Sequence, residues 1–126
     1  MPEEPFLGTR PRVSPDGEPA QYGDYTWVTY REVQDEATAL AKGLRPLALD
    51  VADGDIQMSV IGIYAGNSAK WLTMDIACVL SGIVMVPLYQ SYGSDAADAA
   101  IAAIGMTTMV AEPPRVDTLL ALKEEG

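Results

Sequence analysis

The stretch that decides the fold is residues 60–93, VIGIYAGNSAKWLTMDIACVLSGIVMVPLYQSYG. Its first part, Val60–Tyr64, is continuously apolar, which is typical of a strand that is covered on both faces. Asn67 predicts a helix start and Gly82 a helix end. The apolar stripe predicted for this helix consists of Ala69, Leu72, Ile76, Val79 and Leu80. Residues 83–88 form a second buried strand, so the pattern predicts a parallel βαβ unit.

The same alternation continues to the end of the chain. Ser94 is expected to cap a third helix, which ends at Gly105 and has its core positions at Ala97, Ile101 and Ile104. Residues 107–111 read as another strand, and Pro113-Pro114 opens a last helix. The predicted fold class is therefore α/β: a partial doubly wound sheet of mostly parallel strands with flanking helices.

Residues 1–24 are rich in proline, glycine and charge, and we expect them to form an irregular N-terminal arm. A short strand is predicted at residues 25–28, and Thr29 with Glu32 forms a capping box for the helix that follows. The core-facing residues of this helix are Val33, Ala37, Leu40 and Leu44, and its predicted end lies near residue 43. A turn is expected at residues 53–55. We therefore divide the chain into the arm, 1–24, and a body, 25–126.

Composition excludes several classes of function. The chain has 126 residues, 48% of them apolar, which suits a globular domain. Its net charge of −10 would repel nucleic-acid phosphates, and no basic stripe is present. The sequence has no histidine, which removes the most frequent general base and metal ligand. We therefore predict no nucleic-acid partner and no metal site in this chain.

Cys78 is the single cysteine and lies in an apolar helical segment, so we interpret it as a buried structural thiol. It permits no intramolecular disulfide, which fits a reducing compartment. The stretch Leu72–Leu88 is strongly apolar, but it is shorter than the about 20 residues that a spanning helix needs. It also contains Asp75 and Gly82, so no transmembrane segment is predicted.

The motifs that would hold a nucleotide are missing from these 126 residues. The turn after the first strand of the βαβ unit is Tyr64-Ala65-Gly66-Asn67, which lacks the G-x-G-x-x-G spacing of a dinucleotide site. No G-x-x-x-x-G-K-[ST] phosphate loop occurs. We therefore predict no catalytic, cofactor-binding or metal-binding residue within this chain, and the substrate-binding residues stay unassigned.

Four side chains have both a functional and a structural reading. Asp75 is interpreted as a surface carboxylate of its helix, and Trp71 as a core or interface residue rather than a ligand platform. Tyr89 and Tyr92 flank the loop after the second strand. Ligands of open α/β sheets gather at the carboxyl ends of strands, so this loop is the best predicted pocket. Ordinary aromatic packing is the favoured reading for both tyrosines.

These residues together resemble one family, the long-chain acyl-CoA synthetases, which are adenylate-forming (AMP-binding) enzymes. The resemblance extends over about residues 6–120. It rests on Phe6–Arg10, Tyr25–Tyr30 with Val33, Gly62–Trp71 with its N-x-x-x-W pattern, Asp75–Cys78, and Val86–Tyr89 with Gly93. No single one of these pieces is specific; the Leu-Gly-Thr-Arg opening together with Pro-Leu-Tyr…Gly favours the long-chain branch.

The resemblance implies an enzyme that activates a long-chain fatty acid with ATP and Mg²⁺ to an acyl-adenylate and transfers the acyl group to CoA. It also implies that the adenylation motifs lie downstream of this portion. We therefore expect an incomplete, N-terminal portion of the large adenylation domain that is inactive alone and binds no cofactor. The parent enzyme is expected to be intracellular, either cytoplasmic or peripheral on intracellular membranes.

Two alternatives stay open. The first is a portion of another adenylate-forming ligase that uses a shorter or aromatic acid. The second is a non-catalytic α/β interaction module. A three-stranded parallel sheet leaves two edges open, so self-association through those edges is an expected property of the chain taken alone.

Overall fold

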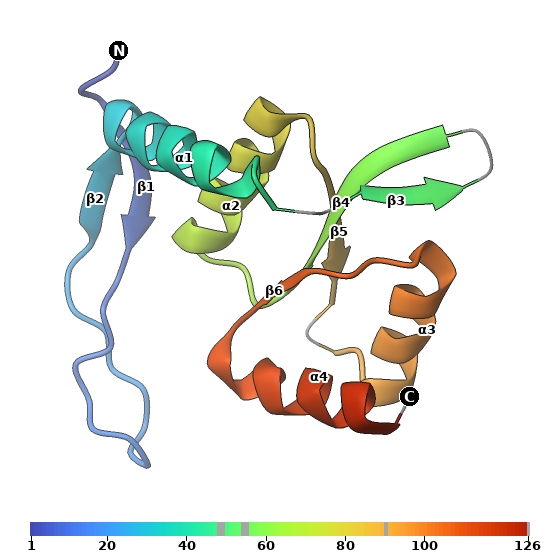
Figure 1. Ribbon diagram of the computed structural model, residues 1–126. Coiled ribbons are helices and arrows are strands. Elements are labelled where there is room, and N and C mark those ends of the chain that lie inside the picture. The colour runs from blue at the N-terminus through green and yellow to red at the C-terminus, as the bar shows by residue number, and fades with distance from the viewer. Residues whose placement is uncertain (48–49, 54–55, 90, 126) are drawn as a thin grey trace.

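The computed structural model describes residues 1–47, 50–53, 56–89 and 91–125. Its elements alternate between strands and helices over most of the chain (Figure 1). In chain order they are β1 (Pro5–Thr9), β2 (Thr26–Thr29), α1 (Tyr30–Leu44), β3 (Asp50–Asp53), β4 (Ile56–Tyr64), α2 (Ala69–Ser81), β5 (Val84–Leu88), α3 (Ser94–Ile104), β6 (Met109–Ala111) and α4 (Pro113–Glu125). The expected turn at residues 53–55 falls mainly outside the described residues, because 54 and 55 are not among them.

Strand β4 is the centre of the main sheet. Its residues Val60–Tyr64 pair in parallel with β5, and Gly62–Tyr64 pair in parallel with β6 on the other side. The parallel strands therefore stand in the order β5-β4-β6, so the chain crosses over β4 between its second and third parallel strands. This order confirms the predicted doubly wound α/β arrangement.

Helices cover both faces of this sheet, as Figure 1 shows, with α1 and α2 on one face and α3 and α4 on the other. Side chains alternate between the two faces of a strand. Ile61 of β4 accordingly packs with Ala37 and Ala77 from α1 and α2, whereas Tyr64 packs with Ala97 of α3. The continuous apolar run of β4 is explained by this double coverage.

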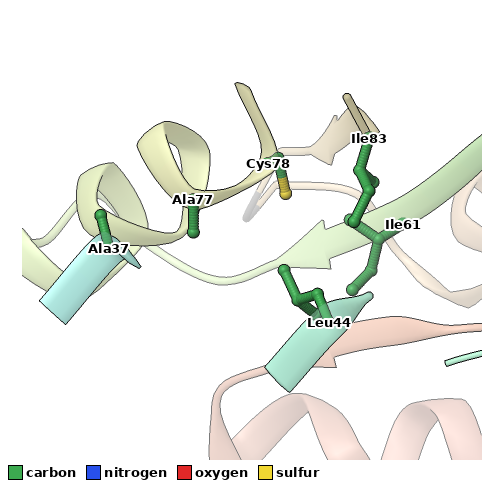
Figure 2. Packing of buried hydrophobic residues seen from close by; sticks show 6 residues of the cluster. All are labelled: Ala37, Leu44, Ile61, Ala77, Cys78 and Ile83. Carbon is green, nitrogen blue, oxygen red and sulfur yellow. The ribbon is translucent and has the colours of Figure 1, made fainter. Parts of the chain in front are cut away.

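The core under α1 and α2 is drawn in Figure 2. Ala37 and Ala77 are both fully buried, and side chains this small let two helices approach closely. The buried face of α2 is Thr73, Ala77 and Cys78. The predicted stripe was therefore wrong at its end, because Val79 and Leu80 are 72% and 49% exposed.

The predicted helix ends are confirmed at some positions and corrected at others. The Thr29–Glu32 capping box is present, and Gly82 and Gly105 end their helices in the left-handed conformation that glycine adopts without strain. The cap of α2 is Ser68, whose Oγ accepts from Trp71 N–H at 3.1 Å, rather than Asn67. Gly93 precedes α3, so Ser94 is its first helical residue and not its cap.

The N-terminal arm is not wholly irregular as predicted, because residues 5–9 form β1, which pairs antiparallel with β2. Phe6 stacks on Tyr30 of α1 with ring centroids 4.3 Å apart, and Glu3 forms an ion pair with Arg31. These contacts hold the arm to the start of α1. A second strand that the sequence reading missed, β3, pairs antiparallel with the first half of β4.

Within the described residues, the helices are all too short or too polar to cross a membrane. The apolar stretch 72–88 is instead divided between the end of α2 and β5.

The Cys78 thiol is buried as predicted, at 1% exposure. Burial raises the pKa of this thiol, and the negative charge of Asp75 adds to the effect. We expect a thiol reagent at pH 8.5 to modify the folded chain at least about a hundredfold more slowly than the chain in urea. Equal rates would contradict the burial.

The raised pKa of Cys78 also predicts a pH dependence of stability. Above about pH 8.5 the unfolded chain loses the thiol proton while the folded chain keeps it. The contribution of the thiol to the free energy of unfolding is therefore fully present below that pH and is lost as the pH rises toward the pKa of the folded chain. Urea unfolding from pH 7 to 10 measures this, and Cys78→Ala, as the control, should reduce the decline.

Candidate functional site

The strand order creates one distinctive position at the carboxyl edge of the sheet. The connection after β4 leads to β5 on one side, whereas β6 lies on the other side of β4. Neighbouring β4 and β6 thus form a topological switch point, where ligands of open α/β sheets bind. Helices α2 and α4 both begin beside this point.

A crevice of about 640 Å³ lies at the switch point, within the size range of small-molecule sites. The turn after β4 (residues 65–68) and the turn after β6 (Glu112 and Pro113) form two of its walls. Its apolar lining comes from α1, α2, β4 and β6: Leu40, Ile63, Trp71, Met74, Val110 and Ala111. The only cation in this lining is Lys70, which is paired with Glu36.

Glu112 connects the two turns that line the crevice. Its carboxylate accepts a hydrogen bond from the backbone N–H of Gly66 at 3.4 Å and lies 3.8 Å from the Arg115 guanidinium. The Arg115 guanidinium lies over the Tyr64 ring, 4.9 Å from its centroid, in cation–π geometry. The Tyr64 hydroxyl in turn donates to the Tyr92 carbonyl. This chain of contacts joins the turns that follow β4, β5 and β6.

The loop after β5, where the sequence predicted a pocket, lines a separate depression of about 520 Å³. Tyr89 is on its wall and 69% exposed, together with Trp71 and Ser91. Tyr92 does not line it; its ring meets that of Tyr89 edge to face at 5.4 Å, which agrees with the favoured packing interpretation. Trp71 lies between the two depressions and lines both.

Asp75, the remaining candidate from the sequence, lies on α2, is partly exposed and does not line the crevice. The sequence reading did not single out Glu112 or Arg115. Glu112 could have been noticed because it directly follows a predicted strand. The strand order that puts this position at the switch point cannot be predicted from local sequence pattern.

Metal ligands do not gather in the described part of the chain: no group of three or more cysteine or acidic side chains lies close enough to hold an ion. The crevice is therefore an apolar depression with paired charges at its rim. It resembles the wall of a pocket for an organic ligand more than a phosphate or metal site.

The family model described as "AMP-binding enzyme" matches residues 9–126. The chain belongs to the AMP-binding enzyme family. This assignment confirms the resemblance that the sequence motifs indicated.

Two curated relatives of this chain are long-chain acyl-CoA synthetases. It is 34% identical over 123 residues to the peroxisomal long chain acyl-CoA synthetase 7 of Arabidopsis thaliana, and 44% identical over 91 residues to the peroxisomal synthetase 6 of the same plant. These alignments cover 98% and 72% of the chain. The chain spans only 16% and 11% of the length of these two relatives.

Solved structures support the AMP-binding fold. The A domain of a carboxylic acid reductase from Segniliparus rugosus matches 93% of the chain with a TM-score of 0.67 at 21% identity, and the chain covers 18% of it. ATP-bound MatB from Rhodopseudomonas palustris matches 79% of the chain with a TM-score of 0.65 at 23% identity, and 19% of that protein is covered. At these identities the similarity concerns the fold alone, and it confirms the predicted fold class.

Proposed function

We propose that this chain is part of an ATP-dependent long-chain fatty-acid–CoA ligase. In the proposed reaction the acid is first activated by ATP to an acyl-adenylate, and the CoA thiol then displaces AMP. The observation that carries the proposal is the 34% identity to a long chain acyl-CoA synthetase across 98% of the chain. The match to the AMP-binding family model supports the use of ATP.

For this reaction, residues 1–126 are proposed to supply scaffold and one wall of a pocket. Activation of a carboxylate needs cations or backbone donors around a triphosphate and a metal held by carboxylates. Among the described residues that line the crevice, Lys70 is the one cationic side chain, and it is already paired with Glu36. We accordingly assign no catalytic, cofactor-binding or metal-binding residue to these residues, and divide them into the arm, 1–24, and the first portion of the adenylation domain, 25–126.

The test compares residues 1–126 with a longer protein that contains them. Each is incubated with palmitate, ATP, Mg²⁺ and CoA, and palmitoyl-CoA is measured. We expect the longer protein to form palmitoyl-CoA and residues 1–126 to form none above the enzyme-free blank. Palmitoyl-CoA from residues 1–126 would contradict the proposed division of labour. Failure of the longer protein with every acid tested would contradict the ligase proposal itself.

A second candidate is a CoA ligase for a different acid. The chain is 33% identical over 97 residues to the probable CoA ligase CCL6 of Humulus lupulus, a name that specifies no long-chain acid. A series of acids from acetate to stearate, together with an aromatic acid, separates the two candidates. Highest kcat/KM at twelve carbons or more supports the long-chain assignment, and highest kcat/KM for acetate or the aromatic acid supports the second.

The remaining assignments follow from the proposed ligase. Its partners are the fatty acid, ATP with Mg²⁺, and CoA, with no nucleic acid among them. We infer an intracellular enzyme, either cytoplasmic or peripheral on an intracellular membrane. The peroxisomal names of two relatives support a place inside the cell.

A further inference from the structure

Glu112 occupies a place that no part of the proposed function explains. It is the first residue after β6, on the edge where the crevice opens, and its carboxylate reaches across the switch point to the turn after β4. Its side chain is 33% exposed and that of Arg115 is 28% exposed, so water only partly screens their 3.8 Å contact.

The partners of Glu112 come from separate parts of the chain. Gly66 follows β4, and its N–H points to the Glu112 carboxylate across 46 positions of sequence. The Glu112 backbone N–H donates to the Tyr64 carbonyl at 3.3 Å, so both the main chain and the side chain of Glu112 hold this turn. Arg115 completes the arrangement, since its guanidinium contacts both the Glu112 carboxylate and the Tyr64 ring.

We propose that Glu112 is a positioning residue: its carboxylate fixes the turn after β4 relative to the turn after β6, and so sets the shape of the crevice at the switch point. The proposal rests on the proposed function in that the crevice is taken as a wall of the ligase's substrate pocket. Glu112 acts through the backbone of residues 65–68, which line the crevice, and not through the reacting atoms.

The first test measures amide hydrogen exchange in the longest protein that contains this chain. Glu112→Ala should raise exchange of the amides of residues 65–68 by about tenfold, as expected for loss of a charge-assisted hydrogen bond. Glu112→Gln keeps an oxygen that Gly66 can reach, so its increase should stay below about twofold. Asp117→Asn removes an exposed carboxylate from α4, the helix that follows Glu112, and should leave the exchange of these amides unchanged.

The second test separates positioning from general destabilisation. In acyl-CoA formation, Glu112→Ala should raise KM for the acid or for ATP about tenfold with kcat within about twofold. An equal rise of exchange over β4 and the turn, an unchanged KM, or a glutamine variant as impaired as the alanine variant would overturn the proposal. A protein without ligase activity overturns only the proposed function, because the exchange measurement still decides the role of Glu112.

Discussion

Tyr64→Ala is expected to lower the free energy of unfolding by about 3–5 kcal/mol, which is the usual cost of removing a large aromatic side chain from a core. Tyr64 is fully buried at the end of the central strand, where it packs on Leu88 and Ala97. Its ring also carries the Arg115 guanidinium. Native domains are stable by only about 5–15 kcal/mol, so the loss is a large part of the total.

Urea unfolding followed by circular dichroism measures this loss. Tyr64→Phe is the matched control, because it keeps the ring and the cation–π contact and removes only the hydroxyl that donates to the Tyr92 carbonyl. Tyr64→Phe should lower the free energy of unfolding by about 1 kcal/mol. Should alanine and phenylalanine cost the same, packing under α3 and α4 would not be the source of the effect.

The sequence predicted the elements whose signals are local. The apolar run 60–64, the Thr29–Glu32 capping box and the glycines at 82 and 105 each act within a few residues, and each was found where expected. Strand β1 was missed because its partner β2 lies far along the chain. Pairing with β2 stabilises β1. The sequence around β1 is rich in proline and charge, so it gives no local strand signal.

The stripe of α2 shows a second limit of local pattern. This helix is apolar on more than one side, so periodicity alone does not say which side is buried. The close approach of Ala37 to α2 decides it, and Ala77 with Cys78 faces inward while Val79 faces out. The crevice between β4 and β6 was not predicted for a similar reason: it depends on the order β5-β4-β6, which arises only when the strands assemble. The depression beside the loop after β5 was predicted.

Gly62→Val is expected to lower the free energy of unfolding by about 1–2 kcal/mol, although valine favours strands. The intrinsic preference for valine in a strand is worth at most about 1 kcal/mol. Opposing it, a Cβ at position 62 would lie 2.6 Å from Sδ of Met106 and 2.8 Å from Cε of Met109. Overpacking of a buried site costs about 1–3 kcal/mol, so overpacking outweighs the preference.

The two methionines also supply the control for Gly62→Val. Both contacts involve the flexible ends of methionine side chains, so Gly62→Ala should cost less than about 1.5 kcal/mol. Met106→Ala opens the space that the valine needs. The loss of unfolding free energy in the double variant should therefore be about 1 kcal/mol smaller than the sum of the losses in the two single variants. Additive losses would mean that the strain does not arise from contact with Met106.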